Sequence, residues 1–169
     1  MLAAGMHITA WLFLVVYPLS FMNINIKNVS LYLDQVLLLL LFLKSFMVLY
    51  QINVKLMIVG DYDRKGADYY RNVKKYINDN GLVNDVIFTG LINNLGKYYS
   101  AFDILWLPSL YEGMPTVGIE AQANGLPILA SDVITKSMKI INNVVFLNTK
   151  NKESLWAEKT KDILSENRI

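Results

Sequence analysis

The sequence predicts an α/β fold in which a parallel sheet is flanked by helices. Short apolar runs bounded by turn residues recur along residues 52–165, as buried parallel strands do. Segments with apolar residues at helical spacing separate these runs. The chain has 169 residues and is 54% hydrophobic, which suffices for a core. Such alternation predicts right-handed crossovers between parallel strands.

The predicted elements follow one another in a regular order. They are a strand at 54–61, a helix at 67–80, a strand at 85–90, a short helix at 95–101, a strand at 104–109, a helix from Pro115, strands at 126–131 and 143–147, and a helix at 153–166. The first strand ends in a turn at Gly60, and the first helix carries Val73 and Ile77 on one face and stops at Gly81. The last helix is amphipathic through Trp156 and Ile163.

The first fifty residues differ from the rest, because their only charged residues are Lys27, Asp34 and Lys44. Residues 8–22 are almost wholly apolar but short for a bilayer span of about 20 residues. Residues 31–50 are long enough, yet they include two of those charges. No Lys or Arg precedes Lys27, which disfavours a secretory signal.

We therefore divide the chain into a hydrophobic N-terminal segment, residues 1–51, and a folded domain, residues 52–169. Two alternatives stay open for the first segment. Residues 8–50 form a membrane-associated hairpin, or the segment is non-native and results from a shifted reading frame or a misplaced start. The break in composition near Gln51 motivates the second alternative.

Composition excludes several function classes. A net charge of +2 spread over mixed charges disfavours nucleic-acid binding. The absence of Cys removes disulfides, Cys-ligated zinc and thiol catalysis, and fits a reducing compartment such as the cytoplasm. His7 is the only histidine, so neither a His-based metal site nor a Ser-His-Asp triad is expected.

The segment from Tyr111 to Pro127 is the best evidence of function. It puts Glu112 and Glu120 eight positions apart across a loop-to-helix junction, where Pro115 suits a first helical turn. A glutamate in such a turn often does no more than offset the helix dipole. The apolar strands on both sides favour a functional site, because ligands of open parallel sheets bind at the carboxyl ends of the strands.

The start of this helix is expected to bind an oxygen-rich ligand. The positive end of the helix dipole and the free backbone N–H groups favour a phosphate or a sugar oxygen there. We expect three residues to supply these N–H groups: Thr116, Val117 and Gly118.

Other conspicuous residues are assigned no chemistry. At helical spacing, aromatic residues are most often packing residues, and we expect this of Tyr69, Tyr70, Tyr76, Tyr98 and Tyr99. We expect a solvated helix face from Arg64, Lys65, Arg71, Lys74 and Lys75. Gly60 and Gly90 do not form a G-x-G-x-x-G fingerprint, so a nicotinamide dinucleotide site is disfavoured.

Residues 52–165 resemble the C-terminal half of a retaining nucleotide-sugar glycosyltransferase of family 4, which has the two-Rossmann GT-B fold. The resemblance is to transferases that build bacterial capsular or exopolysaccharide, commonly from a UDP-sugar. It implies a Rossmann-like domain, no cofactor and no metal. The matching stretches keep the family's order and spacing: 59–61, 86–90, 102–104, 107–109, 112–127 and 131–132.

The resemblance assigns roles by position. Glu120 resembles the second Glu of the E-x7-E motif, which binds the ribose hydroxyls of the donor. Glu112 resembles the first Glu, which faces the donor sugar and is the catalytic candidate. The loop with Gly113 and the N–H groups of Met114, Thr116 and Val117 would contact sugar and phosphate oxygens. The turn at Gly90 and Leu91 would border the base, and Gly60 is a further donor-binding residue.

The chain also departs from the family pattern. The family places a strand ending in Gly-Arg and a nearby Lys before the stretch that matches 59–61, and these cations clamp the diphosphate. Residues 1–51 contain no Arg, and neither Lys27 nor Lys44 has suitable surroundings. The N-terminal domain that binds the glycan or lipid-linked acceptor is also missing. We therefore expect a truncated hexosyltransferase with little activity alone, located in the cytoplasm or at the inner face of the membrane.

Two rival classes stay open beside this one. The first is a membrane-anchored nucleotide-binding module without catalysis. The second is a flavodoxin-like signalling domain, which would leave the pattern of residues 112–127 unexplained.

Overall fold

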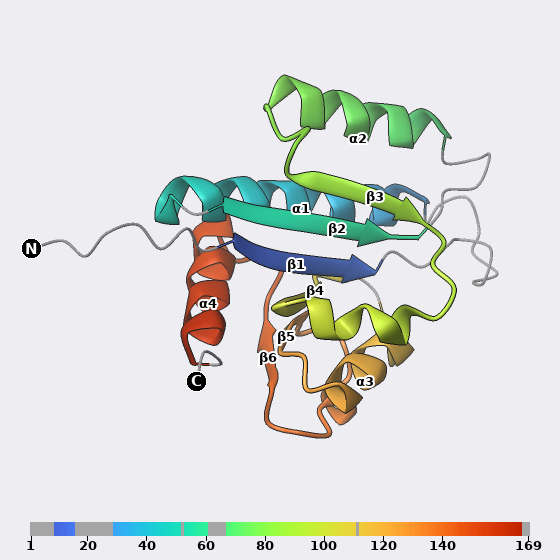
Figure 1. Cartoon of the computed structure of the whole chain (residues 1–169), viewed down its shortest axis with the longest axis vertical. Helices are drawn as coiled ribbons and strands as arrows, with labels where there is room; N and C mark the ends of the chain where they lie inside the picture. The colour runs from blue at the N-terminus through green and yellow to red at the C-terminus, as the bar shows by residue number, and fades with distance from the viewer. Residues whose placement is uncertain (1–8, 16–28, 52, 61–66, 111, 167–169) are drawn as a thin grey trace, which may run out of the picture.

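The computed structural model describes residues 9–15, 29–51, 53–60, 67–110 and 112–166. Its strands form one parallel sheet of six strands in the order β3-β2-β1-β4-β5-β6 (Figure 1). The strands are β1 (Thr9–Val15), β2 (Asn53–Val59), β3 (Val86–Gly90), β4 (Ile104–Leu107), β5 (Ile128–Ser131) and β6 (Val144–Leu147). The predicted parallel α/β architecture is confirmed.

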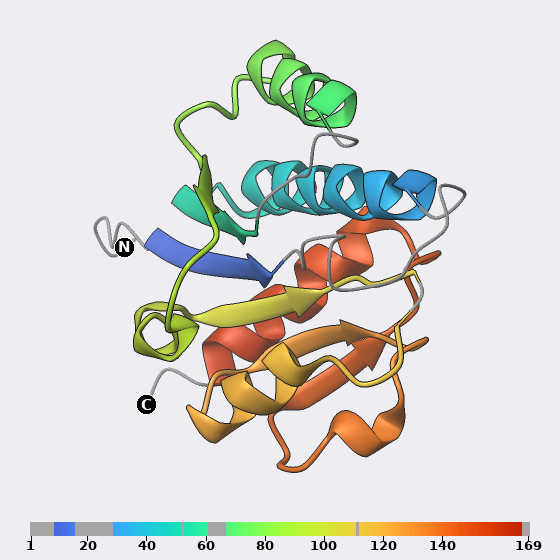
Figure 2. The ribbon, with the colours of Figure 1, turned by 90° about the vertical axis from the view of Figure 1, so that its right-hand side faces the viewer.

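In the described residues, four α-helices and three short 3-10 turns accompany the strands. They are α1 (Val29–Tyr50), α2 (Ala67–Asp79), α3 (Thr116–Ala123), α4 (Glu153–Glu166), η4 (Leu95–Lys97), η5 (Tyr99–Ala101) and η6 (Lys136–Met138). The helix expected at 95–101 is thus the pair of turns η4 and η5. Figure 2 shows α4 and α3 on opposite sides of the lower strands.

Strand β4 shows how the helices cover both faces of the sheet. Ile104 and Trp106 belong to the hydrophobic cluster shared with α1, α2 and α4, whereas Leu105 and Leu107 belong to the cluster shared with α3 and η6. This alternation arises because successive side chains of a strand point to opposite faces. All four residues are buried, as the unbroken apolar run predicts for an inner parallel strand.

The described parts of the hydrophobic N-terminal segment, residues 9–15 and 29–51, contribute to this same sheet and core. β1 lies between β2 and β4, and its register places Leu14 opposite Ile58 and Leu12 opposite Ile104. Among the α1 residues whose burial is described, those with completely buried side chains are Leu39, Leu40, Phe42, Leu43 and Phe46. The change of composition near residue 51 therefore does not coincide with a boundary of the sheet or of the core.

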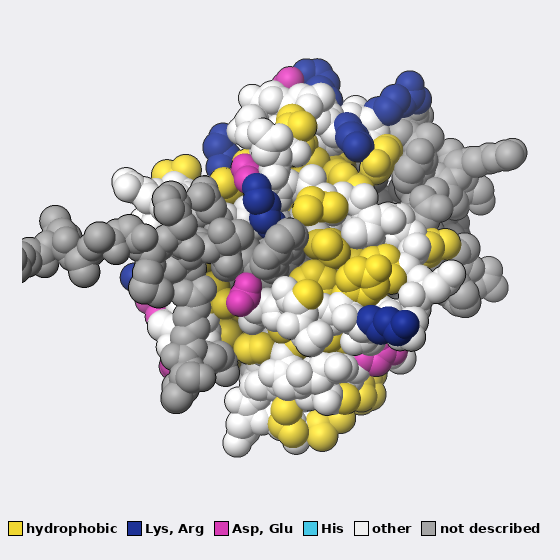
Figure 3. All heavy atoms as spheres, viewed as in Figure 1, with side chains coloured by type: hydrophobic (Ala, Val, Ile, Leu, Met, Phe, Trp, Pro, Cys, Tyr) yellow, Lys and Arg dark blue, Asp and Glu magenta, His cyan; other side chains and the backbone are white. Residues whose placement is uncertain are grey.

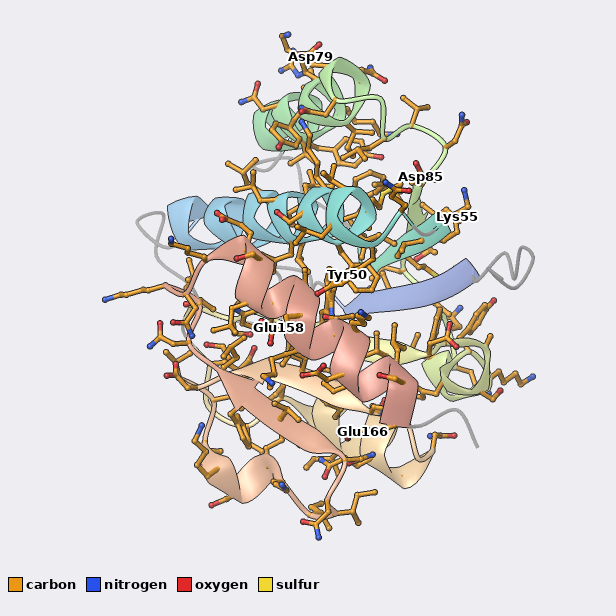
Figure 4. The ribbon with its side chains drawn as sticks, turned by 90° about the vertical axis from the view of Figure 1, so that its left-hand side faces the viewer. Tyr50, Lys55, Asp79, Asp85, Glu158 and Glu166 are labelled. Atoms are coloured by element: carbon orange, nitrogen blue, oxygen red, sulfur yellow. The ribbon has the colours of Figure 1, made fainter. Side chains whose placement is uncertain are left out.

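Aromatic contacts fasten α1 to α4. The ring of Phe42 stacks on Trp156, with the ring centroids 4.6 Å apart. Phe42 and Trp106 form an edge-to-face pair, with the ring centroids 6.3 Å apart. At the end of α1, Tyr50 lies between α1 and α4 (Figure 4), with Lys161 Nζ 4.7 Å from its ring centroid. None of the helices that the structure describes is long and apolar enough to cross a membrane.

An ion pair joins β2 to the segment before β3. Lys55 Nζ lies 2.9 Å from Asp85 Oδ1 and donates to the carbonyl oxygen of Asn84 at 2.7 Å. Figure 4 shows Lys55 and Asp85 near each other beside the sheet, on the side away from α4. The pair is mostly shielded from solvent, and it holds the two neighbouring strands at their amino ends.

Candidate functional site

Both glutamates of the motif belong to the segment that follows β4, which consists of a loop and helix α3. Glu112 is in the loop after β4, and Glu120 is in the second turn of the helix. The helix begins at Thr116, and the extended residue before it is Pro115, with φ −72° and ψ 119°. Because all six strands are parallel, their carboxyl ends meet at this edge of the sheet.

The Glu112 carboxylate is half-buried beside the end of β4. Burial raises the pKa of Glu112, because a desolvated carboxyl disfavours its charged form. The Ser109 hydroxyl donates a hydrogen bond to Glu112 Oε2 at 3.2 Å, and this bond lowers the pKa in part. Ser109 is itself buried, so its position is set by the core around β4.

The Glu120 carboxylate is held from another part of the chain. The Tyr99 hydroxyl, on turn η5, donates to Glu120 Oε2 at 2.9 Å. The Glu120 side chain is exposed, whereas Tyr99 is 1% exposed. A solvent-facing carboxylate is therefore fixed by a buried phenol.

The expected turn at the end of β3 is also present at this edge. Gly60 N–H donates to the carbonyl oxygen of Gly90 at 3.0 Å, which joins the ends of β2 and β3 by an isolated bridge. Gly90 has φ +66°, a conformation that glycine adopts without strain. Leu91 follows and is 65% exposed.

The residues at the start of α3 differ in which of their groups are accessible to a ligand. Met114 is 51% exposed, whereas the Val117 side chain is buried and leaves only its backbone for such a contact. The expectation of a free N–H group at Gly118 was wrong. This group donates to the carbonyl oxygen of Pro115 at 3.0 Å, because the chain tightens into a turn as the helix begins.

The sequence of this chain matches a known protein family over most of its length. The sequence profile described as "Glycosyl transferases group 1" matches residues 14–166. The chain belongs to this family. The profile includes part of β1 and all of α1, so the match is not confined to the more polar part of the chain.

Two curated relatives illustrate the likeness of this group 1 glycosyltransferase chain. It is 34% identical over 108 residues to the putative glycosyltransferase EpsF of Bacillus subtilis, which is 63% of the chain and 27% of EpsF. It is 35% identical over 77 residues to an Escherichia coli UDP-Gal:alpha-D-GlcNAc-diphosphoundecaprenol alpha-1,3-galactosyltransferase, which is 46% of the chain and 19% of that enzyme. The chain thus spans about a quarter of the EpsF length.

Solved structures share the fold. Anabaena Alr3699/HepE in complex with UDP-glucose matches with a TM-score of 0.70 and 17% identity, over 94% of the chain and 40% of HepE. The C-terminal domain of LpcC, a group 1 protein of Francisella tularensis, matches with a TM-score of 0.65 and 18% identity, over 92% of the chain and 75% of that domain. The Rossmann-like GT-B assignment is confirmed.

A buried glutamine links α3 of this glycosyltransferase chain to η6 and to the loop after it. Gln122 Nε2 donates to the carbonyl oxygens of Gly118 at 3.0 Å and Met138 at 2.8 Å. Its Oε1 accepts from the N–H groups of Ile140 at 2.9 Å and Ile141 at 3.2 Å. Gln122 therefore couples the helix that carries Glu120 to the loop after η6.

Sequence reasoning missed three residues that position this site: Ser109, Tyr99 and Gln122. Ser109 was visible as a polar residue three positions before Glu112, so local spacing was a usable signal. Tyr99 was assigned to packing only, and it does lie in the core. Its 21-residue separation from Glu120 carries no local pattern that marks the contact.

The basic residues of α2 form the expected solvated face. Arg71, Lys74 and Lys75 are exposed, and Lys74 Nζ lies 5.2 Å from the ring centroids of Tyr70 and Phe88. Figure 3 shows Lys and Arg side chains gathered at the top of one face, over α2. The expectations for Arg64 and Lys65 fall outside the described residues.

Two further features bear on ligands. In the described ranges, no group of three or more His, Cys, Asp and Glu side chains is placed to hold a metal ion. A shallow cavity of about 420 Å³ lies near Tyr99, Asp103 and residues 124–127, which adjoin the amino ends of β4 and β5. Neither Glu112 nor Glu120 lines this cavity.

Proposed function

We propose that this chain binds the nucleotide-sugar donor of a retaining glycosyltransferase, with a UDP-sugar as the donor. The observation that carries the proposal is the pair of glutamates at the start of α3, each held by a hydroxyl group that the fold supplies. The name of the E. coli relative specifies UDP-Gal, and the HepE structure contains UDP-glucose. Both support a uridine nucleotide.

Glu120 is the proposed ribose ligand. A carboxylate has two oxygens with about four acceptor sites, so it accepts a bond from Tyr99 and from ribose hydroxyls together. Hydrogen bonds to an ionised acceptor are about twice as strong as neutral ones. The exposed position of Glu120 leaves its carboxylate accessible to such a ligand.

Glu112 is the proposed catalytic residue. In a retaining transfer the donor sugar gains positive charge as the diphosphate departs, and a carboxylate beside the ring stabilises that charge. The half-buried setting strengthens this interaction, because charges attract more strongly where water is excluded. The Ser109 hydroxyl sets the orientation of the Glu112 carboxylate.

The remaining contacts come from the backbone around the two glutamates. Gly113 and the N–H groups of residues 114, 116 and 117 are proposed to contact sugar and phosphate oxygens, aided by the helix dipole. The bridged glycines Gly60 and Gly90, with exposed Leu91, are proposed to border the base.

For the whole protein we propose transfer of the sugar to a glycan or lipid-linked acceptor during polysaccharide synthesis. The E. coli relative is named for a diphosphoundecaprenol acceptor, and an Erwinia amylovora relative is named for amylovoran biosynthesis. Residues 1–51 contain no Arg that could clamp the diphosphate. We therefore expect the 169-residue chain by itself to transfer sugar weakly.

Calorimetric titration of the 169-residue chain with UDP tests the donor proposal. Glu120→Gln removes the charge from the ribose ligand and should weaken UDP binding about tenfold to a hundredfold, as the loss of charged hydrogen bonds does. Glu158→Gln, an exposed change on α4, is the matched control and should bind as the wild type does. Equal affinity of wild type and Glu120→Gln, or no binding by either, would refute the proposal.

A further inference from the structure

We infer that Tyr99 is a positioning residue for recognition of the donor ribose, acting through Glu120. The inference deepens the proposed function and rests on it. Its basis is the hydrogen bond of 2.9 Å from the Tyr99 hydroxyl to Glu120 Oε2, which joins turn η5 to helix α3.

The Tyr99 ring is immobilised by the core. It is 1% exposed and belongs to the hydrophobic cluster that also contains Val117 and Ala121 of α3. The backbone of η5 is closed by a hydrogen bond of 3.3 Å from Phe102 N–H to the Tyr99 carbonyl oxygen. With the ring held, the position of the phenol oxygen is determined before any ligand arrives.

Unlike the Tyr99 ring, the Glu120 side chain is not immobilised by the core. A glutamate on a solvent-facing part of a helix samples several rotamers, and fixing them on binding costs affinity. The hydrogen bond from the Tyr99 hydroxyl restricts the carboxylate in the unliganded protein and uses one acceptor position of Oε2. The carboxylate is therefore preorganised to accept bonds from a diol such as the ribose 2′ and 3′ hydroxyls.

Neighbouring Tyr98 provides a matched control. It is the preceding residue and is 42% exposed. Tyr98→Phe removes the same atom from an adjacent position. Any general effect of losing a tyrosine hydroxyl in this turn should appear in both variants, whereas an effect through Glu120 should appear only in Tyr99→Phe.

The test compares UDP with 2′,3′-dideoxy-UDP, which lacks both ribose hydroxyls, by calorimetry on the 169-residue chain. Tyr99→Phe should weaken UDP about threefold to tenfold, as expected for freeing one immobilised side chain. It should leave binding of the dideoxy nucleotide unchanged. In a Glu120→Gln background, Tyr99→Phe should have no further effect on UDP binding.

Each alternative outcome overturns a defined statement. If UDP binds and Glu120→Gln weakens it, but Tyr99→Phe binds UDP as wild type does, the inference fails and the proposed function stands. An equal loss for both nucleotides would show that Tyr99 has only a structural role, and this also overturns the inference. If Glu120→Gln has no effect, the proposed function and the inference fail together.

A second substitution covers the case in which Tyr99→Phe does not fold. Fluorotyrosine at position 99 keeps the buried ring and makes the hydroxyl a stronger hydrogen-bond donor. The inference expects the affinity for UDP to change while the affinity for the dideoxy nucleotide stays constant. Unchanged UDP binding in this variant would overturn it.

Discussion

Gly118 of α3 lies so close to Met138 of η6 that a Cβ atom on the glycine would stand 2.5 Å from the methionine sulfur. Real Cβ atoms essentially never approach another atom so closely. Met138 is completely buried, so its side chain has little room to yield. A side chain at position 118 would therefore force Met138 to shift where the first turn of α3 packs on η6.

Gly118→Ala should destabilise the fold despite the better helix propensity of alanine. Overpacking a core costs about 1–3 kcal/mol, and the propensity gain of about 1 kcal/mol offsets only part of it. In a Met138→Ala background the clash is gone, so the same substitution should become neutral or stabilising. Urea unfolding of the four proteins measures this. Additive effects in the four proteins would contradict the close contact.

Gln122→Leu should be among the most destabilising polar-to-apolar changes in the described part of the chain. It removes the partners of two carbonyl groups and two N–H groups around α3 and η6. The two hydrogen bonds to carbonyl groups are buried, and a buried group left unsatisfied costs about 1–3 kcal/mol. Asn124→Ala, at an exposed site with a hydrogen bond to the Glu120 carbonyl, should cost about 0.5 kcal/mol or less. Similar unfolding free energies for both variants would contradict the bracing role.

Phe42→Ala tests whether α1 stabilises the rest of the domain. The Phe42 ring is completely buried against Trp106 and Trp156, and such truncations cost about 3–5 kcal/mol. Val48→Ala, on the same helix but 68% exposed, should change stability by about 0.5 kcal/mol or less. Thermal and urea unfolding measure both. Equal stability of Phe42→Ala and wild type would mean that α1 does not pack on this core in solution.

Glu112 should make the stability of the fold depend on pH. Burial raises the pKa of its carboxyl above the ordinary value of 4.5. Between that value and the raised pKa, the folded state binds more protons than the unfolded state, so the free energy of unfolding falls as pH rises. Glu112→Gln should remove this pH-dependent fall in the free energy of unfolding. Its stability relative to wild type should therefore increase from about pH 4 to about pH 7.

Ser109→Ala provides the companion change. The Ser109 hydroxyl lowers the pKa of Glu112, so its removal should raise that pKa further and extend the pH range over which stability falls. NMR titration of the Glu112 carboxyl carbon follows the pKa directly. A lower pKa in Ser109→Ala, or a Glu112→Gln advantage that shrinks with rising pH, would contradict this account.

The sequence by itself determined the strands and α-helices from residue 53 onward and the placement of the glutamate pair. Apolar runs, helical spacing and turn residues are local properties, so they predicted β2 to β6 and α4 closely. The spacing of Glu112 and Glu120 across a helix start is also local. For these features, the residues that carry the signal are the ones that form the structure.

Only the tertiary structure decided the role of the apolar residues 9–15 and 29–50. A continuous apolar run looks the same whether lipid or a protein core surrounds it. Residues 36, 39, 40, 42, 43 and 46 proved to form the buried side of α1, and residues 9–15 proved to be an inner strand. The contacts of Tyr99 with Glu120 and of Gln122 with Ile140 likewise depend on packing. They join residues far apart in the chain, and their geometry exists only once the sheet and helices have assembled.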